Sequence, residues 1–475
     1  MKLGEIMSLL TSAEAATRLQ PRIRSQEPMG FSIDSRTIKP GELFFAVRGE
    51  IHDGHNFVKQ ALDRGALAAV VEWGYRAENI DESSLIRTSD TLRSLQSLAS
   101  TVLRTWQGFE IAITGSSGKT TTKEITAAVL SRTARVIKSS GNLNNAYGVP
   151  LSVLKMESDG AHASDFDFGV FEMGMNHAGE ISELTRIAPP DLGVVTNVAA
   201  VHLEFFESVD EIAEAKAEMV SGIKPGGAAV LNADDDRVAR MRSRRRDVEF
   251  RTFGIERNAD VMAREIKADG LRGSSFILAT PHGEVAAKLP LTGRHNLLNA
   301  LAAAAIGDFY GVPVSEIASA LATCTPPKMR GQLVKLANDI TVINDSYNSN
   351  PNALDEMIAT LRSTECKRRI VVAGEMLELG ASGPELHRAS GRRISSADIG
   401  LLIGVRGMAN EIVKGAREAG FTADNAVFCE TVEDAAELLL GRLDAGDCVL
   451  VKGSRGVRME IVVERLRKQL GEAPE

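Results

Sequence analysis

The chain has 475 residues, of which 44% are hydrophobic and 25% are charged, and its formal net charge is −8. At roughly 150 residues per domain, this length favours three domains of ordinary globular composition. The acidic balance argues against a nucleic-acid partner, and no apolar run approaches the ~20 residues of a membrane span.

The four cysteines lie far apart in the sequence and form no C-x-x-C pair. This spacing argues against a disulfide framework and a structural zinc site, and it fits a reducing compartment. We therefore expect a cytoplasmic protein, and we expect it to be a monomer.

Short apolar segments that end in glycine or a polar turn alternate with helical segments. This rhythm is typical of parallel α/β sheets, which bind ligands at the carboxyl ends of their strands. Residues 260–293 differ, because their pattern predicts antiparallel strands with turns. We expect buried strands within residues 65–73, 109–115, 166–174, 191–198, 226–234, 368–376, 399–405 and 446–454.

Two breaks divide the chain into three predicted domains, residues 1–107, 108–324 and 325–475. The first lies near Thr105–Glu110, just before a strand, and the second lies near Thr323–Gln332, where paired prolines stop a helical segment. We expect an α/β protein with a small α/β N-terminal domain, a central mononucleotide-binding parallel sheet and a Rossmann-like C-terminal domain.

The segment "ITGSSGKTTTKEIT", residues 113–126, lies between a predicted strand and a predicted helix. It is a short phosphate-binding loop, T-G-x-x-G-K-T, that lacks the first glycine of the usual pattern. Lys119 would reach the β- and γ-phosphates and Thr120 would offer a hydroxyl to Mg²⁺, whereas the alternative is a glycine-rich turn without a ligand. The predicted ATP-binding residues here are Thr114, Gly115, Ser116, Ser117, Gly118, Lys119, Thr120 and Thr121.

Four further segments, residues 139–154, 171–184, 196–219 and 293–305, resemble the Mur ligases, the ATP-dependent amide-forming enzymes of peptidoglycan precursor synthesis. The segments "INDSYNSNPNAL", "AGEMLELG" and "LVKGSRGVRME" are similar to the branch that joins UDP-N-acetylmuramoyl tripeptide to D-alanyl-D-alanine. The resemblance covers nearly the whole chain. It implies that ATP phosphorylates the peptide carboxylate, that the amine attacks this acyl phosphate, and that Mg²⁺ neutralises the charge.

The predicted catalytic residues are Lys119, Glu172, His202 and Lys216, and the predicted metal ligands are Thr120, Glu172, His202 and Lys216. Glu172 ends a strand beside the phosphate loop, which suits the oxygen preference of Mg²⁺. From chemistry alone, His202 is either a ligand or a core or capping residue. A lysine such as Lys216 in an acidic helix usually lies on a solvated face. The resemblance implies that both serve a second Mg²⁺, with Lys216 carbamylated.

Asparagines provide candidate contacts for phosphate, substrate and adenine. Asn144 and Asn145 follow a predicted strand, where they bind a phosphate or substrate carboxylate or merely form a turn. Asn296 and Asn299 share one helix face, where they bind a purine edge or, for Asn296, cap the helix. The resemblance favours the ligand roles, and among the first pair it favours Asn145.

The resemblance also implies that the C-terminal domain closes over ATP, which would exclude water from the acyl phosphate. Arg330 would contact the γ-phosphate and Asp345 the ribose, and Tyr347 and Asn348 complete their motif as substrate-binding candidates. The D-alanyl-D-alanine carboxylate would meet the segment around Ser454, with Lys452 and Arg455 as neighbours. Glu375 stands where the family usually has aspartate, so a direct contact by this residue is not expected.

The N-terminal domain resembles the UDP-sugar domain of the later Mur ligases. Its polar residues would bind uracil, ribose or diphosphate, and the alternative is a β-turn with capping residues. The candidates are Ser32, Asp34, Ser35, Arg36 and Arg48.

Two rival functions remain at this point. One is another Mur-type or folylpolyglutamate-type amino-acid ligase, and the other is a non-catalytic P-loop nucleotide-binding regulator. The combination of Glu172, His202 and Lys216 argues against the regulator, because a nucleotide sensor has no evident need for a second metal.

Overall fold

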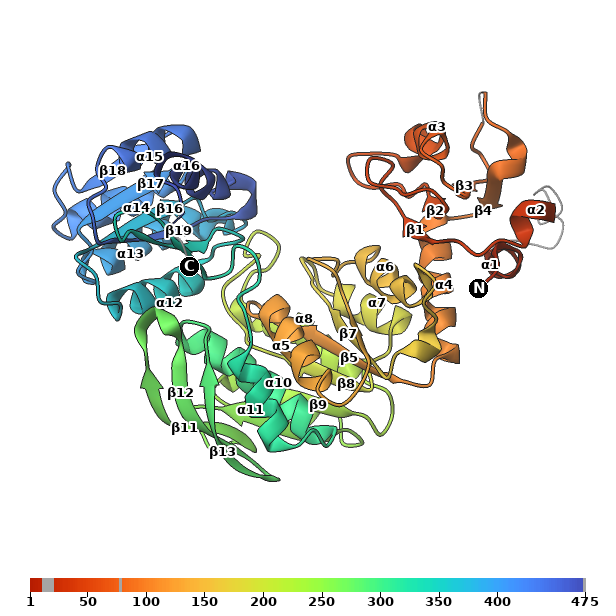
Figure 1. Ribbon diagram of the computed structural model, residues 1–475, viewed down its shortest axis with the longest axis horizontal. Helices are drawn as coiled ribbons and strands as arrows, with labels where there is room; N and C mark the ends of the chain where they lie inside the picture. The colour runs from red at the N-terminus through yellow and green to blue at the C-terminus, as the bar shows by residue number, and fades with distance from the viewer. Residues whose placement is uncertain (11–20, 77–78, 473–475) are drawn as a thin grey trace.

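The computed structural model describes residues 1–10, 21–76 and 79–472, and within these residues the strands form three separate sheets. Figure 1 shows three lobes in chain order, with the central lobe between the N-terminal and C-terminal lobes. The expected three-sheet α/β fold with a parallel central sheet is therefore confirmed.

The N-terminal lobe contains a four-stranded parallel sheet in the order β1-β2-β3-β4, as far as the described residues show. Its apolar core continues into the central lobe, because helix α4 packs against both. Asp90 caps α4 by accepting a hydrogen bond from Arg93 N at 2.9 Å. The strands are β1 Gly30–Ser32, β2 Glu42–Phe45, β3 Ala68–Glu72 and β4 Leu85–Thr88, and the helices are α1 Leu3–Leu10, α2 Pro21–Arg24, α3 Val58–Asp63 and α4 Thr91–Thr105.

The central lobe contains a nine-stranded sheet in the order β13-β12-β11-β10-β9-β8-β5-β7-β6. The pairs from β6 to β11 are parallel, and β12 and β13 continue the sheet in antiparallel fashion, as the pattern of residues 260–293 predicts. The strands are β5 Phe109–Thr114, β6 Val136–Lys138, β7 Phe168–Glu172, β8 Leu192–Val195, β9 Ala228–Asn232, β10 Glu249–Gly254, β11 Val261–Ala268, β12 Ser274–Thr280 and β13 Gly283–Leu289.

Helices cover both faces of the central sheet. Ser208 begins α8 by accepting a hydrogen bond from Glu211 N, and acidic residues occupy the first turn of this helix, where the helix dipole favours them. The helices of the lobe are α5 Lys119–Leu130, α6 Gly148–Leu154, α7 Glu180–Ile187, α8 Val209–Ser221, α9 Asp236–Arg240, α10 Arg294–Phe309 and α11 Val314–Ala322.

Strand order places three chain segments together at one edge of the central sheet. β5 lies between β7 and β8, and all three run parallel. Because parallel strands share a carboxyl edge, the loop after β5, the end of β7 and the residues after β8 meet there. This edge holds the candidate site.

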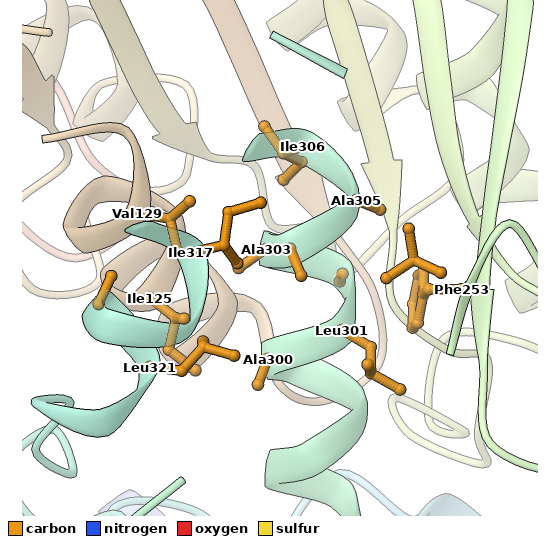
Figure 2. Close-up of a cluster of buried hydrophobic side chains, with 14 of the residues drawn as sticks. Ile125, Val129, Phe253, Ala300, Leu301, Ala303, Ala305, Ile306, Ile317 and Leu321 are labelled. Carbon is orange, nitrogen blue, oxygen red and sulfur yellow. The ribbon is translucent and has the colours of Figure 1, made fainter. Parts of the chain in front are cut away.

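Helix α10 is almost wholly buried, and its alanines let other elements approach closely. Figure 2 shows Ala300 and Ala303 directed toward Ile125 of α5 and Leu321 of α11, whereas Leu301 lies on the side of Phe253 from β10. Short side chains on the first face allow α5 and α10 to pack closely. The phosphate-loop helix is thereby fixed against the helix that carries Asn296 and Asn299.

The C-terminal lobe contains a six-stranded sheet in the order β14-β15-β19-β16-β17-β18, with β14 antiparallel and the others parallel. Asn350 caps α12 and Pro351 occupies its first turn, a typical helix start. The strands are β14 Gln332–Lys335, β15 Thr341–Asp345, β16 Arg368–Gly374, β17 Leu401–Val405, β18 Ala426–Cys429 and β19 Asp447–Lys452, and the helices are α12 Pro351–Arg362, α13 Gly383–Ser395, α14 Ala409–Glu418, α15 Val432–Leu440 and α16 Glu460–Leu470.

Each of the eight segments predicted as buried strands contains a strand, namely β3, β5, β7, β8, β9, β16, β17 and β19. Each sheet also lies inside one of the ranges 1–107, 108–324 and 325–475, and we propose these ranges as the domains. Among the described residues, no helix is both long enough and apolar enough to cross a membrane.

An unpaired carboxyl group is buried near the start of β5. Glu110 is 1% exposed, and neither of its carboxyl oxygens has a hydrogen-bond partner. Burial raises the pKa of this carboxyl to about 8, and the nearby Asp191 raises it further while Lys224 opposes the shift. The folded protein therefore favours the protonated form of Glu110.

We predict that Glu110 makes the protein less stable as the pH rises. The folded pKa of about 8 lies above the ordinary value of 4.5, so the stabilisation is complete below pH 4.5 and is lost as the pH rises through 8. Glu110→Gln should remove this dependence, so the thermal midpoint of the variant relative to that of the parent should rise from pH 6 to about pH 8 and level off above it. Differential scanning calorimetry across this pH range measures the two thermal midpoints, and Glu50→Gln, at an exposed position, is the control. Equal profiles for parent and Glu110→Gln would contradict the prediction.

Candidate active site

A cavity of about 600 Å³ lies between the carboxyl edge of the central sheet and the C-terminal lobe. Most of the predicted nucleotide, metal and catalytic residues line it, although they come from distant parts of the chain. Those that line it are Ser116, Ser117, Gly118, Lys119, Thr120, Thr121, Asn144, Glu172, His202, Asn296, Asn299, Arg330, Asp345, Tyr347, Asn348 and Ser454.

The glycines of the phosphate loop are required by close contacts. Gly115 has a φ of +151°, and a Cβ there would lie 1.9 Å from Thr196 Oγ1. Gly118 has a φ of +81°, and a Cβ there would lie 2.2 Å from Asn299 Oδ1. Since Gly118 is also the N-cap of α5, the turn brings backbone N–H groups and the positive helix end to the cavity.

Asn197, which sequence reasoning did not select, holds the loop in this shape. Its backbone carbonyl accepts a hydrogen bond from Ser116 N at 2.9 Å, and its side-chain oxygen accepts one from Ser117 N at 3.0 Å. Its neighbour Thr196 donates from Oγ1 to Ser117 O at 2.7 Å. The position of Asn197 directly after β8 is the signal that could have identified it.

Glu172 lies at the end of β7, is 2% exposed and joins two segments of the site. Thr120 donates from Oγ1 to one carboxylate oxygen at 2.8 Å, and Asn144 donates from Nδ2 to the other at 2.8 Å. Asn145 instead accepts a hydrogen bond from Gly148 N at 3.0 Å. Asn144, and not Asn145, therefore contacts the carboxylate of Glu172.

A buried lysine that sequence reasoning missed anchors the Asn144 loop. Lys123 is 0% exposed, and its Nζ donates to Ser139 O at 2.7 Å and to Gly141 O at 3.2 Å. Ser139 Oγ in turn accepts a hydrogen bond from Glu172 N at 3.1 Å. Lys123 lies one helical turn after Lys119 in α5, which is the only sequence signal for its role.

Two lysines of the central lobe, half-buried Lys119 and buried Lys216, have lowered pKa values. Burial lowers the pKa of Lys119, the Glu172 carboxylate raises it and Arg330 lowers it further. Burial also lowers the pKa of Lys216 well below its usual range, and the charge of Lys119 adds to this shift. Lys216 is 1% exposed, so it does not lie on a solvated helix face. It is close enough to Lys119 to feel its charge, but it is not part of the cavity lining.

His202 faces the C-terminal lobe. Its Nδ1 lies 2.6 Å from Glu378 Oε2, although the angle is not that of an ordinary hydrogen bond. This contact lowers the pKa of the Glu378 carboxyl, against the opposing effect of burial. Glu378 lies in the segment "AGEMLELG" that the sequence analysis selected, although the residue itself was not singled out.

Asn296 and Asn299 are buried against the phosphate-loop helix. Asn299 Oδ1 accepts a hydrogen bond from Thr122 Oγ1 at 3.2 Å, and its Nδ2 donates to Asn296 Oδ1 at 3.3 Å. Asn296 donates to Thr292 O at 2.7 Å. The N-cap of α10 is Gly293, so Asn296 does not cap this helix.

The linker between the two larger lobes brings an arginine to the cavity. Arg330 lies over the ring of Tyr347, with its guanidinium carbon 4.0 Å from the ring centroid. Tyr347 N donates to Met329 O at 3.1 Å, and Met329 has a left-handed backbone with a φ of +60°. These contacts hold the linker against the start of the C-terminal lobe.

Other predicted residues of the C-terminal lobe are tied to one another. Lys452 is 3% exposed and forms an ion pair with Asp345. Ser454 Oγ accepts a hydrogen bond from Leu377 N at 2.9 Å. Glu375 accepts one from Met408 N at 3.0 Å, so it fixes the turn after β17.

The N-terminal candidates are not brought to this cavity. Arg36 pairs with Asp34 at 2.8 Å, and Ser35 donates to Gln60 Oε1 at 2.8 Å. Arg48 pairs with Glu72 at 3.0 Å. None of the five residues lines the cavity, and their polar contacts lie within the first lobe, where Ser32 also donates to Asp34 O.

The donor set at Glu172 fits Mg²⁺. Among the described residues there is no group of three His, Cys, Asp or Glu side chains that could hold a metal alone. Mg²⁺ does not require such a group, because it is commonly bound by one or two protein oxygens together with phosphates and water. The Thr120 hydroxyl and the Glu172 carboxylate, 2.8 Å apart beside the phosphate loop, provide those oxygens.

The fold and the site define a P-loop nucleotide-binding protein with a cavity shared by two lobes. Three family models match the chain: "Mur ligase family, catalytic domain" over residues 29–131, "Mur ligase middle domain" over 113–307 and "Mur ligase, glutamate ligase domain" over 329–455. The chain belongs to the Mur ligase family.

Individual relatives cover almost the whole chain. The UDP-N-acetylmuramoyl-tripeptide–D-alanyl-D-alanine ligase of Bacillus subtilis is 32% identical over 95% of both chains. A crystal structure of MurF from Acinetobacter baumannii matches with a TM-score of 0.82 and 31% identity, over 92% of this chain and 93% of that one. The MurF ligase from Thermotoga maritima in complex with ADP matches with a TM-score of 0.79 and 28% identity, over 95% of this chain and 99% of that one.

We predict that Lys123→Met loosens the loop that carries Asn144. The substitution removes a charged donor from the backbone carbonyls of buried Ser139 and exposed Gly141, a loss of about 1.5–3 kcal/mol for a buried bond of this kind. Amide hydrogen exchange in residues 139–145 should rise at least tenfold, since 1.4 kcal/mol corresponds to a factor of ten. Lys138→Met is the matched control, because Lys138 is a partly exposed lysine that pairs with Glu124 on the surface. Unchanged exchange in Lys123→Met would contradict the anchoring role.

Proposed function

We propose that this protein joins UDP-N-acetylmuramoyl tripeptide to D-alanyl-D-alanine in an ATP-dependent reaction of peptidoglycan precursor synthesis. Relatives with this named activity are at least 30% identical over more than 90% of the chain, and the related Thermotoga structure contains ADP. The observation that carries the proposal is the convergence of Lys119, Thr120, Glu172 and Arg330 on one cavity between two lobes.

The triphosphate would lie along the phosphate loop, with its β- and γ-phosphates near Lys119 and the N-terminus of α5. Thr120 and Glu172 would hold Mg²⁺, which when bound neutralises the phosphate charge. Arg330, from the linker, would approach the γ-phosphate from the opposite side. Lys119 is held in place before the reaction, since its Nζ donates to Gly115 O at 2.8 Å.

The reaction has two steps. A carboxylate oxygen of the tripeptide attacks the γ-phosphorus, and the bond to ADP breaks to give an acyl phosphate and ADP. The amine of D-alanyl-D-alanine then attacks the acyl carbon and loses a proton, and phosphate leaves with the electrons of the C–O bond. Fixed cations at the cavity stabilise the charge that develops on the phosphoryl and acyl oxygens.

Lys216 is chemically suited to carbamylation. Burial and the charge of Lys119 lower its pKa well below the usual range, which favours the neutral amine, the form that adds to CO₂ with loss of a proton. The product is an anion, which the nearby charge of Lys119 would favour, whereas the same charge disfavours the protonated amine. We propose that the carbamate and His202 hold a second Mg²⁺.

We propose ligand contacts at three further places. Asn296, Asn299 and Asp345 would contact the adenosine of ATP. The five polar residues of the N-terminal lobe would bind the UDP end, and Asn144, Asn145, Tyr347 and Asn348 the tripeptide. Ser454, with the neighbouring Arg455, would meet the acceptor carboxylate, and the exposed guanidinium of Arg455 is the better placed because Ser454 is buried.

We also propose that the protein acts as a cytoplasmic monomer. A single copy of the chain already brings the phosphate loop, Glu172 and Arg330 to one cavity. The four cysteines are free thiols, as expected in a reducing compartment. Light scattering of the purified protein tests the monomer directly.

We predict that phosphate release from ATP requires both the UDP-linked tripeptide and D-alanyl-D-alanine. Purified protein, ATP and Mg²⁺ are assayed with each acceptor in turn, and separate tripeptides with lysine or meso-diaminopimelate at the third position identify the donor. Release that depends on folate and glutamate would support the folylpolyglutamate-type alternative. Nucleotide binding without release under any of these conditions would support a regulator.

We predict that Lys216→Ala loses turnover, by at least 100-fold, but keeps its affinity for ADP. Short carboxylic acids such as acetate should restore part of the activity, because they can occupy the space of the carbamate. Lys216→Arg retains a cation and fills that space, so it should be inactive and not rescued. Turnover of Lys216→Ala equal to that of the parent would contradict the carbamate.

A further inference from the structure

We propose that Glu378 of the C-terminal lobe is a positioning residue for His202. Through this residue the C-terminal lobe would contribute to the second metal site. The inference rests on the proposed function of His202 as a metal ligand. Within the described part of the chain, the polar contacts of Glu378 join it to His202 and to Glu204 N, so its effect on the site would pass through the imidazole.

The contact joins two lobes that are far apart in sequence. His202 lies in the loop after β8, Glu378 lies in the loop after β16, and both residues line the shared cavity. Nδ1 of His202 is 2.6 Å from Glu378 Oε2 and has no other polar partner among the described residues. Within the described part of the chain, Glu378 is therefore the carboxylate in contact with Nδ1 of this ring.

Backbone geometry on both sides supports a built contact. His202 has a φ of +55° and Glu378 a φ of +64°, and left-handed backbone is uncommon for residues with side chains. Glu204 N donates to Glu378 O at 3.3 Å. A Cβ on Gly380, which has a φ of +54°, would lie 2.9 Å from Leu203 O. Two strained residues and a glycine thus bring the loops together.

The chemistry explains why an imidazole needs this partner. A metal-binding histidine usually donates its second ring N–H to a carboxylate or carbonyl, which sets the tautomer and the ring orientation. With Nδ1 directed to Glu378, Nε2 is the nitrogen left for the metal. The Glu378 side chain is 47% exposed and the His202 side chain is 20% exposed, so the carboxylate is not there to satisfy a buried core.

A linkage between metal and lobe position follows. The imidazole is oriented only when the loop after β16 lies against the loop after β8. Metal binding at His202 therefore favours the docked lobe, and docking favours metal binding by the same factor. The site for the second metal is complete only in the arrangement that also covers the cavity.

The test uses Mn²⁺ as the probe, in the full-length protein with saturating ADP, and measures free Mn²⁺ by electron paramagnetic resonance. Glu378→Ala should weaken one class of Mn²⁺ site by about 10–100-fold, the usual effect of removing such a partner. Glu378→Gln retains an oxygen that accepts from Nδ1–H, and it should stay within about threefold of the parent in this binding assay. Glu385→Gln, on the exposed face of α13, is the control and should match the parent.

A double-substitution cycle shows whether the effect passes through His202. Glu378→Ala in a His202→Ala background should cause no further loss of Mn²⁺ affinity, because the ring that it orients is absent. A further loss there, or parent-like Mn²⁺ affinity in Glu378→Ala alone, would overturn the proposal. Metal-free ADP affinity, unchanged in each variant, shows that the variants are folded.

The outcome is separable from that of the proposed function. Parent protein that ligates D-alanyl-D-alanine while Glu378→Ala binds Mn²⁺ normally would overturn the positioning role alone. Parent protein that fails to ligate, while Glu378→Ala loses Mn²⁺ affinity and the loss disappears without His202, would support the positioning role and overturn the ligase.

Discussion

The site depends on keeping one buried carboxylate, that of Glu172, between groups that satisfy both of its oxygens. A carboxylate that is 2% exposed is costly unless it is paired, and Thr120 and Asn144 each donate to it at 2.8 Å. These two bonds attach the phosphate-loop helix and the loop after β6 to the same carboxylate. The Glu172 carboxylate raises the pKa of Lys119, and the charge of Lys119 in turn lowers the pKa of the buried Lys216.

The three lobes make unequal contributions to this arrangement. The central sheet supplies the phosphate loop, Glu172 and the residues after β8 because β5, β7 and β8 end at one edge. The C-terminal lobe adds Asp345 and Glu378, and the linker adds Arg330. The N-terminal lobe holds polar contacts of its own, and its apolar core includes residues of the central lobe such as Leu154 and Phe171.

Sequence patterns predicted the features that depend on residues close together in the chain. Short apolar segments followed by glycine or a polar turn predicted eight strands, and all eight are present. Their parallel order predicted that Glu172 and the phosphate loop lie at one edge of the sheet. Contacts between residues far apart in the chain have no local sequence pattern. The contact of Glu378 with His202, 176 positions earlier (378 − 202), was therefore not predicted. Lys123 reads as an ordinary helical lysine, because its burial depends on a loop that folds over it. The choice between Asn144 and Asn145 depends on loop orientation, which neighbouring identical residues cannot reveal.

Met329 gives the linker an energetic bias of its own. A residue with a side chain in left-handed backbone costs roughly 1–2 kcal/mol, and here that conformation is held by the bond from Tyr347 N. If that bond opens, the linker can relax to ordinary extended backbone and recover this energy. The observed linker conformation is therefore slightly strained. A ligand that bridges both lobes needs only a modest difference in affinity between two linker conformations to decide which of them is populated.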